Sequence, residues 1–505
     1  MKKITALSLF IIMLLISSKA FTQTNASGPY FSNTTWNISG SPYNLIGDVQ
    51  IPNGVSLTVE AGVVINFNSD YEILIKGNLL ANGNNTSPII FNGNINGKSM
   101  IIFKDTNLSN SELSFLEFNG PKNAFQLADE SEFIQDAIKN SGTLSISNVT
   151  FTNTRISTDG YQTTANLLIE NSTFNSTNVQ GTYPRSESIE LKNSNLYNSN
   201  VNSDSYNYGI IIDNCTAQNT NFSIGCCGAN LEFLESNLID STISEGSGNP
   251  KVGPVKITQS EFDNTTLNLP AARVESNSSV FNFDGSFGLI FGNGTFECSQ
   301  ISGNNTGTAI KITGYDGYNI GNNVVFSNST IKDNSIGIDI ENANEISISN
   351  SNIYNNSSFN IRNTSIENIS AMNNWWGSAE ANTIESKIYD YYDNINFGII
   401  NYSNYLNNLE DISSNCPLLT LSTLNIDNTK TLLYPNPNNG RVNINFGTTP
   451  IGSSIKVFNT NGQVIYETEN VISQFYQFEL NVKSGLYIIQ INNYNKTEFA
   501  KLIIK

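Results

Sequence analysis

A register repeats through the middle of this chain with a spacing of about 22 residues, which is the length of one coil in a solenoid of short strands. Residues two and four positions before each repeat point are apolar, as in Leu144 and Ile146, and apolar residues recur three and eight positions after it, as in Phe151 and Ile156. This alternation predicts two or three short strands per unit, joined by Asn, Ser and Thr corners. The repeat points are Asn148, Asn171, Asn193, Asn214, Glu235, Gln259, Asn293, Asn328, Asn350 and Asn373.

A unit of this size cannot bury its apolar side alone, so neighbouring units must stack. Neither its length nor its residue types fit a helical repeat, and we therefore expect a parallel β-solenoid in which each strand pairs with its equivalent one coil away. Like residues then stack on like. The Asn column is expected to form a buried amide ladder, with Asn193 enclosed between Asn171 and Asn214.

Composition and charge limit the partners of the chain. It has 505 residues, 13% of them charged, and a formal net charge of −18, which disfavours binding to nucleic acid or anionic membranes. Residues 1–20 have the features of an export signal peptide: two lysines, an apolar run from Leu7 to Ile16 and a small-x-small site at Ser18 to Ala20. The run is too short to span a bilayer, and no transmembrane segment is expected elsewhere.

The register ends at Trp376, and the predicted organisation follows from that point. Residues 30–403 are expected to form the solenoid and its C-terminal cap, 404–430 a linker, and 431–505 a small antiparallel β-sandwich made of hairpins. Trp376 falls on an inward column and is expected to close the core, while Ser378 is expected to cap a helix over the open end. The stretch from Ala124 to Ile138 reads as a loosely helical insertion.

Five cysteines are too few and too irregularly spaced for a disulfide framework or a zinc site. Cys215 lies within a loop's reach of Cys226 or Cys227, which makes one local disulfide a candidate. No metal site or cofactor is predicted from these residues.

The last 74 residues contain four segments in a fixed order: LYPNPNNG from Leu433, IKVFNTNGQVIYE from Ile455, SGLYIIQI from Ser484, and the terminal KLIIK. In these segments the chain resembles the type A C-terminal sorting domain of the type IX secretion system of Bacteroidetes. The resemblance implies transport across the outer membrane, recognition by the secretion machinery, and a secreted or outer-surface location. The positions that carry the motif are Tyr434, Pro435, Asn436, Pro437, Gly440, Gly485 and Tyr487.

Residues 51–401 resemble right-handed parallel β-helix proteins of the pectate-lyase type. The resemblance rests on GVSLTVEAGVVINF in the first coils and on NNWWG followed by IYDYYDNINFGIINY at the end. The implied fold is all-β, a right-handed parallel β-helix followed by the sandwich. That fold hosts lyases, hydrolases and many chains without catalysis, so it does not by itself give the activity.

The absence of histidine excludes hydrolases of this fold that depend on paired Asp and His. A polysaccharide lyase needs a Lys or Arg base beside carboxylates, with calcium as a possible cofactor. The candidate cluster for that alternative is Lys192 with Glu170, Asp213 and Glu190 on successive rungs. The favoured interpretation of these residues is a charge ladder between coils, so no catalytic residue is favoured.

Two successive coils look long, and their extra residues, 268–288 and 302–322, are expected to leave the solenoid as adjacent loops. Such loops commonly form a ligand-binding surface on one side of a solenoid, although loops that only pack against the solenoid are an equal alternative. The candidate ligand-binding residues on them are Tyr315, Asp316, Tyr318, Phe281 and Asp284. Together these features predict a non-catalytic adhesin or glycan-binding scaffold, with an extracellular polysaccharide or a host surface glycan as its partner.

Overall fold

The structure is a computed structural model of the whole chain, and the chain divides into two compact units, Met1–Thr420 and Leu421–Lys505. Each unit is described separately. The described residues are 23–504 except for 95–96, 98, 129–139, 160–163, 183–187, 205–208, 226–228, 247–252, 286, 315–322, 343–344, 410–415, 417–431, 435–439, 446–452, 460–461, 472–474 and 494–495. The predicted signal peptide, residues 1–20, lies outside this range and stays a prediction.

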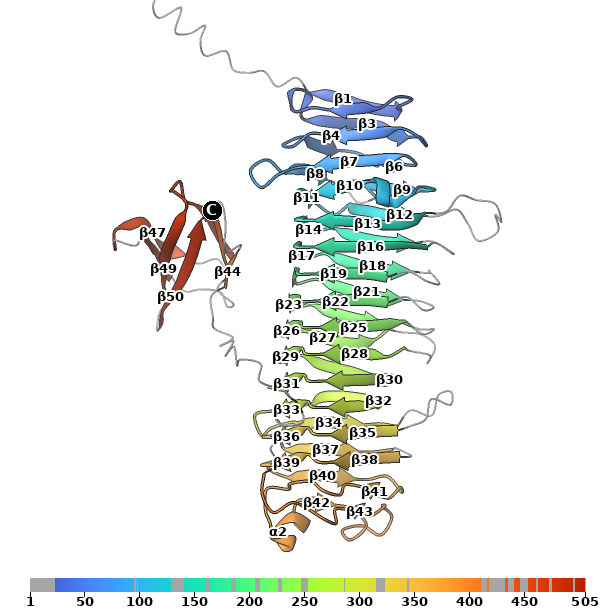
Figure 1. Ribbon diagram of the computed structural model, residues 1–505, viewed down its shortest axis with the longest axis vertical. Helices are drawn as coiled ribbons and strands as arrows, with labels where there is room; N and C mark the ends of the chain where they lie inside the picture. Colours follow the sequence, from blue (N-terminus) through green and yellow to red (C-terminus); the bar gives the residue numbers. More distant parts are fainter. Residues whose placement is uncertain are drawn as a thin grey trace, which may run out of the picture. The chain divides into compact units, whose positions relative to one another are not determined.

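The first unit is a parallel β-solenoid with three faces, because its strands pair in three separate columns (Figure 1). The predicted all-β fold is therefore confirmed. The first face comprises β2 (Thr34–Trp36), β4 (Ser56–Val59), β7 (Asn78–Asn82), β10 (Glu112–Ser114), β13 (Ser141–Ser147), β16 (Thr164–Glu170), β19 (Ser188–Lys192), β22 (Gly209–Asp213), β25 (Asn230–Leu234), β28 (Val255–Thr258), β35 (Asn323–Ser327), β38 (Glu345–Ser349), β41 (Ile369–Ser370) and β43 (Ile400–Asn401).

The second face consists mostly of three- and four-residue strands, and the third face of slightly longer ones. The second comprises β5 (Val64–Phe67), β8 (Ile89–Gly93), β11 (Leu116–Asn119), β14 (Thr150–Thr152), β17 (Thr173–Asn175), β20 (Asn195–Tyr197), β23 (Thr216–Gln218), β26 (Asn237–Ile239), β29 (Glu261–Asp263), β31 (Val280–Asn282), β33 (Gln300–Ser302), β36 (Thr330–Lys332) and β39 (Asn352–Tyr354). The third comprises β6 (Ile73–Ile75), β9 (Ile101–Lys104), β12 (Asn123–Ala128), β15 (Arg155–Asp159), β18 (Asn178–Thr182), β21 (Asn200–Asp204), β24 (Asn221–Ile224), β27 (Thr242–Glu245), β34 (Thr308–Ile312), β37 (Ile336–Ile340), β40 (Phe359–Asn363) and β42 (Ile388–Tyr389).

Four long strands turn a corner and serve two faces each. β1 (Thr24–Pro29) and β3 (Tyr43–Ile51) pair on the second and third faces, and β30 (Thr266–Asn277) and β32 (Phe287–Glu297) pair on the third and first. Because β1 pairs with β3, the solenoid begins before residue 30, where the sequence placed its start.

Corners between the first and second faces carry a residue with left-handed backbone, such as Asn193 with φ of 48°. Asn favours this region more than other non-glycine residues do, which explains the column without any buried amide. Asn193 and Asn214 are exposed, although the amide of Asn214 donates to Asn193 Oδ1 at 2.7 Å. The expectation of a buried Asn ladder was therefore wrong, while the register that it defined holds over most of the chain.

The buried ladder is one residue further on. Ser194 Oγ accepts from the backbone N–H of Ser172 at 3.1 Å and donates to the Lys192 carbonyl at 2.7 Å. The same pattern recurs along most of the stack, where the corner N–H of one coil donates to the side chain of the next coil. The buried positions are Ser172, Ser194, Cys215, Ser236, Ser260, Ser279, Ser299, Ser329, Ser351 and Asn374.

One continuous apolar core runs along the solenoid from Ala26 to Ile400. Phenylalanines stack within it, with ring centroids 5.0 Å apart for Phe151 and Phe174. Trp376 is 2% exposed and closes the core at the C-terminal end, as predicted. Helix α2 (Ala381–Glu385) covers that end through Ile384, but its N-cap is Glu380 instead of Ser378.

Two short 3-10 turns, η1 (Ile38–Gly40) and η2 (Leu108–Asn110), complete the described elements of the solenoid. The predicted helical insertion is wrong at its start, because Asn123–Ala128 forms β12 and pairs with β9 and β15. Phe125 and Ala124 are fully buried there, so their apolar spacing reflects the core and not a helix. Residues 129–138 lie outside the described range.

The second unit is an antiparallel sandwich of two sheets. One sheet contains β44 (Leu432–Tyr434), β45 (Arg441–Asn445) and β48 (Phe475–Glu479); the other contains β46 (Ser453–Phe458), β47 (Val464–Val471), β49 (Gly485–Asn493) and β50 (Lys496–Ile504). Val442 and Ile444 from the first sheet pack with Val457 and Ile489 from the second in a core of their own. This confirms the predicted small sandwich.

Candidate functional site

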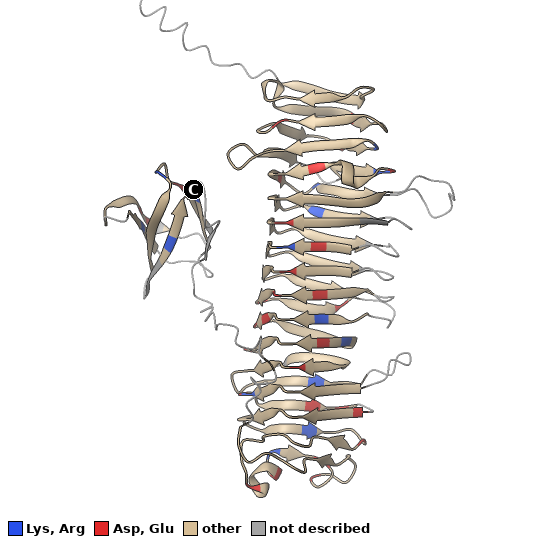
Figure 2. Ribbon diagram, in the orientation of Figure 1, with Lys and Arg blue, Asp and Glu red and all other residues tan. Residues whose placement is uncertain are grey.

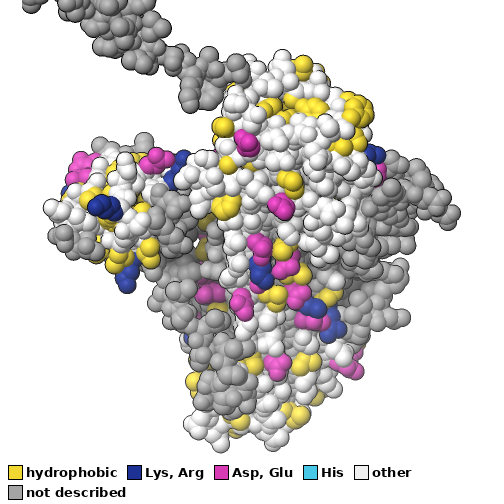
Figure 3. Space-filling model, turned by 45° about the horizontal axis from the view of Figure 1, so that its top comes forward, with side chains coloured by type: hydrophobic (Ala, Val, Ile, Leu, Met, Phe, Trp, Pro, Cys, Tyr) yellow, Lys and Arg dark blue, Asp and Glu magenta, His cyan; other side chains and the backbone are white. Residues whose placement is uncertain are grey.

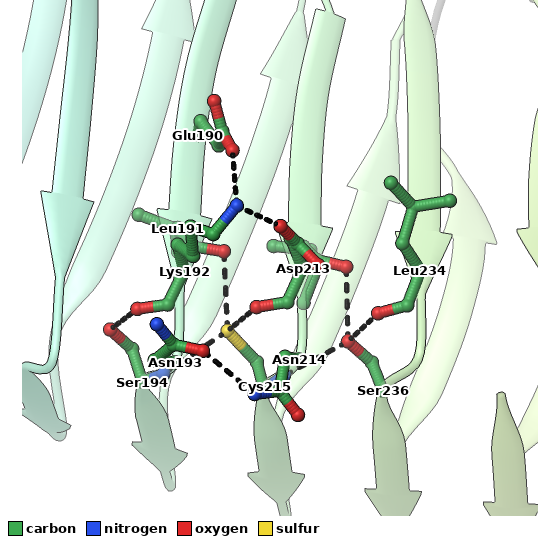
Figure 4. Close-up of polar contacts among 11 residues, drawn as sticks. Glu190, Leu191, Lys192, Asn193, Ser194, Asp213, Asn214, Cys215, Leu234 and Ser236 are labelled. Carbon is green, nitrogen blue, oxygen red and sulfur yellow. Dashed lines mark hydrogen bonds and ion pairs between the residues drawn. The ribbon is translucent and has the colours of Figure 1, made fainter.

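The four charged residues of the lyase alternative lie on the outer side of the first face. Glu170 pairs in register with Lys192, and Lys192 with Asp213, on β16, β19 and β22. The ammonium of Lys192 lies 2.6 Å from Asp213 and 3.7 Å from Glu190, between the two carboxylates (Figure 4). The structure thus brings these predicted residues together, in a face where acids and bases follow one another along the axis (Figure 2).

The electrostatics of the cluster decide what it can do chemically. The hydrogen bond that Lys192 donates to Asp213 is the main cause that raises the pKa of Lys192, and the charges of Asp213, Glu190 and Glu170 act in the same direction. Lys192 is therefore held protonated at neutral pH. An elimination base must accept a proton, so this arrangement works against that role and fits a charge ladder between coils.

The cluster is positioned by the corner that follows it. Cys215 Sγ donates to the carbonyls of Asp213 and Leu191, each at 3.2 Å, and accepts from Ser194 N at 3.4 Å (Figure 4). Cys215 thus occupies a position that serine fills in the neighbouring coils. It is a free, buried cysteine, and burial raises the pKa of its thiol to about 12.

The expected local disulfide of Cys215 was therefore wrong. Instead, Cys298 bonds to Cys416, 118 residues away. Cys298 stands in the left-handed corner column, so this bond ties residues beyond the cap to a solenoid corner. Part of the predicted linker 404–430 is thus held against the solenoid. Cys226 and Cys227 lie outside the described residues.

The two coils that look long in the sequence are organised differently from the expectation. The left-handed corner residues after Gln259 are Ser278 and Cys298, so Asn293 is not a repeat point. Residues 268–288 contain most of β30 and all of β31, and they build a coil that the Asn-based register overlooked. The repeat is hidden in the sequence here because Ser278 and Cys298 occupy the left-handed corner that Asn occupies in most other coils.

Phe281 was predicted as a ligand contact, and this is wrong. It pairs in register with Phe262 and Ile301, is fully buried, and lies 5.2 Å from the Phe262 ring. Asp284 is exposed and accepts a hydrogen bond from the amide of Asn304. Tyr315, Asp316 and Tyr318 lie outside the described residues, so their predicted role in ligand binding stays a prediction.

The sorting motif contains positions whose physical role is visible. Gly440 has φ of 102°, and a Cβ there would lie 2.4 Å from the Leu480 carbonyl oxygen, so only glycine fits. Tyr487 is buried and its hydroxyl donates to the Lys483 carbonyl at 2.7 Å, which closes the turn before β49. Gly485 is exposed, and Tyr434 ends β44. Pro435, Asn436 and Pro437 lie outside the described residues.

The cap contains a cavity that the sequence reasoning missed. It measures about 520 Å³, lies between α2 and β43, and is lined by residues that include Asn382, Glu385, Tyr392, Asn401 and Tyr402. Its sequence signal is the dense aromatic run IYDYYDNINFGIINY, which by itself indicates only the last coil and cap. A cap was expected to cover the core, and nothing in the pattern indicated a hollow beside it.

No group of three or more His, Cys, Asp or Glu residues in the described part of the chain is arranged to hold a metal ion. Within the same residues, no helix is both long enough and apolar enough to cross a membrane.

Comparison with known protein families identifies the domain type of the second unit. Residues 432–505 match the secretion system C-terminal sorting domain. This confirms the predicted sorting domain, and the chain is accordingly a secreted or cell-surface protein that uses the type IX secretion machinery. No curated protein matches the chain.

Three chains of solved structures also match, among them the catalytic domain of GH87 alpha-1,3-glucanase in complex with nigerose. The identity is 12% and the TM-score 0.20, and the match covers 75% of this chain and 63% of that one. This chain therefore spans less than two thirds of the glucanase domain. So distant a likeness carries nothing about activity.

Proposed function

We propose that this exported solenoid is a non-catalytic glycan-binding protein of the cell surface or the medium, acting as an adhesin or scaffold. The sorting domain places the chain outside the cell, where it can meet extracellular polysaccharides and host glycans. The observation that supports the absence of catalysis is the state of Lys192. The one base of the candidate cluster is paired at 2.6 Å with Asp213 and kept protonated.

The second candidate is a polysaccharide lyase, favoured only by the fact that Lys192, Glu190 and Asp213 meet on one face. The two are separated by incubating the full exported chain with uronate polysaccharides, with and without calcium. The ultraviolet absorbance of the unsaturated product is followed. We expect no turnover above the blank. Turnover that Lys192→Ala abolishes would overturn the non-catalytic proposal.

Binding itself is tested with a glycan array probed by the same chain. We expect a defined subset of glycans to retain the protein. If no glycan on a broad array retains it, and no elimination occurs, the glycan-binding proposal is wrong.

A further inference from the structure

An exposed aromatic ring marks the cap cavity between α2 and β43. Tyr392 is 72% exposed, yet its backbone is fixed on both sides of the loop. Its N–H donates to Asp390 Oδ1 at 2.9 Å, and Asp390 Oδ2 accepts from the N–H of Ile400 at 2.8 Å. Asp390 is itself buried. The ring therefore stands at the rim of the cavity on a backbone that loses little freedom when a ligand binds.

Polar groups line the same cavity as that ring. Glu385 Oε2 accepts a hydrogen bond from the Tyr402 hydroxyl at 2.6 Å, which fixes the carboxylate and leaves its other oxygen facing no protein donor among the described residues. Asn401 accepts the N–H of Ser403 through Oδ1 at 3.1 Å, so its amide nitrogen remains available. Asn382 adds a further amide to the lining.

We propose that the cap cavity binds one sugar ring of a neutral glycan, with a ring face on Tyr392 and hydroxyls on Glu385, Asn382 and Asn401. A flat apolar face beside fixed acceptors and donors matches a pyranose, whose C–H face is apolar and whose edge carries hydroxyls. The lining holds a carboxylate and neither Lys nor Arg, so a uronate or sulfated ring would meet uncompensated like charge. This inference rests on the proposed glycan-binding function and deepens it.

Two other cavities, each of about 460 Å³, lack this combination. One is lined by Trp376, which is 2% exposed, and by Tyr354, which is half-buried, so neither presents a freely exposed ring as Tyr392 does. Its cation, Lys387, already donates to the carbonyls of Asn356 and Ser357. The other is lined by hydroxyl residues such as Ser111 and Thr143 and by no aromatic residue.

The test is affinity electrophoresis of the full exported chain in native gels that contain either neutral or uronate polysaccharides. Tyr392→Ala removes the ring and is expected to weaken binding to a neutral glycan at least about tenfold, the usual effect of losing an aromatic anchor. Glu385→Gln keeps the shape of the side chain and is expected to weaken the same binding less. Melting curves of both variants should match that of the parent chain, since both side chains lie at the surface of the cap.

The matched control is Phe31→Ala. Phe31 is an aromatic residue that is 83% exposed at the N-terminal end of the same solenoid, where apolar side chains gather (Figure 3). Its removal should leave the retardation unchanged, which separates a site from general stickiness of exposed rings.

The outcomes are distinct. If the parent chain binds neutral glycans and Tyr392→Ala binds them equally well, the cap site is wrong while the glycan-binding function stands. If only uronate polysaccharides retard the chain, the assignment of a neutral ligand is wrong. If neither class binds, the proposed function fails, and the cap site fails with it.

Discussion

Strands of the solenoid pair in parallel with their equivalents one coil away, whereas strands of the sorting domain pair antiparallel in two small sheets. The solenoid core is one apolar cluster that extends over the whole stack, and each corner repeats the same backbone-to-side-chain bond. The sorting domain has a separate and far smaller core around Val457 and Ile489.

The two units differ in how much of their stability depends on a single residue. A corner of the solenoid is one of many, so the loss of one bond is shared by a long stack. The sandwich has no repeats to share a loss, and among its described glycines Gly440 alone has backbone atoms where a Cβ would lie. The solenoid should therefore tolerate single substitutions better than the sandwich does. Export, however, depends on the sandwich.

Deleting residues 432–505 is expected to have the largest effect. Because the two cores are separate, the remaining chain should fold as a soluble β-solenoid, but it should stay in the periplasm. The measurement is the fraction of protein in medium, surface and periplasm in a host with the type IX system. The same residues grafted onto an unrelated exported protein should carry it outside. Finding the truncated chain in the medium at normal levels would contradict the separation of roles.

Gly440→Val should give the next largest effect, and on one unit only. The left-handed φ and the 2.4 Å approach to the Leu480 oxygen predict a loss of more than about 2 kcal/mol in the sandwich, enough to unfold so small a domain. Export should then fall towards the level of the deletion while the melting transition of the solenoid is unchanged. The control is Glu469→Ala, which changes an exposed residue of β47 outside the four motif segments. Equal export by both variants would argue against the steric reason.

Within the solenoid, Ser194→Ala should cost about 1–3 kcal/mol, because it leaves the buried N–H of Ser172 without an acceptor. Asn193→Gly, one residue earlier, should cost much less, since glycine adopts the left-handed corner freely and Asn193 is exposed. Denaturant unfolding of the two variants compares them directly. If Asn193→Gly lowers the free energy of unfolding more than Ser194→Ala does, the stabilising ladder is formed by the Asn amides instead. Export should be unaffected in both.

The sequence predicts a structural position well only where that position selects one residue type strongly. Asn at the corners marks the coil length correctly, because left-handed backbone selects it. It does not reveal where the buried bonds lie, because serine is common everywhere in this chain and carries no comparable preference. Where Ser278 and Cys298 replace Asn, the register was lost, and Phe281 was placed on a loop instead of in the core.

The candidate sites show the same limit. Strand register alone predicts that Lys192 meets Asp213, since paired rungs are close neighbours in any solenoid. It does not predict the disulfide between Cys298 and Cys416, because the sequence beyond the cap follows no repeat from which the path of the chain could be inferred. The cap cavity is equally hidden, because it arises from how one short helix and the last strand pack.

Cys215→Ser should have the smallest effect and the opposite sign. Cys215 fills a serine position of the ladder, and its sulfur accepts from Ser194 N at 3.4 Å, where the neighbouring serines offer a hydroxyl oxygen, a stronger acceptor than sulfur. A hydroxyl there restores the regular pattern, so the free energy of unfolding should rise by up to about 1 kcal/mol. Cys215→Ala removes the acceptor altogether and should lower it. Because burial raises the thiol pKa to about 12, a thiol reagent should not modify Cys215 in the native chain at neutral pH. Rapid native labelling, or a loss of stability on serine substitution, would show that the corner around Cys215 is packed differently from its neighbours.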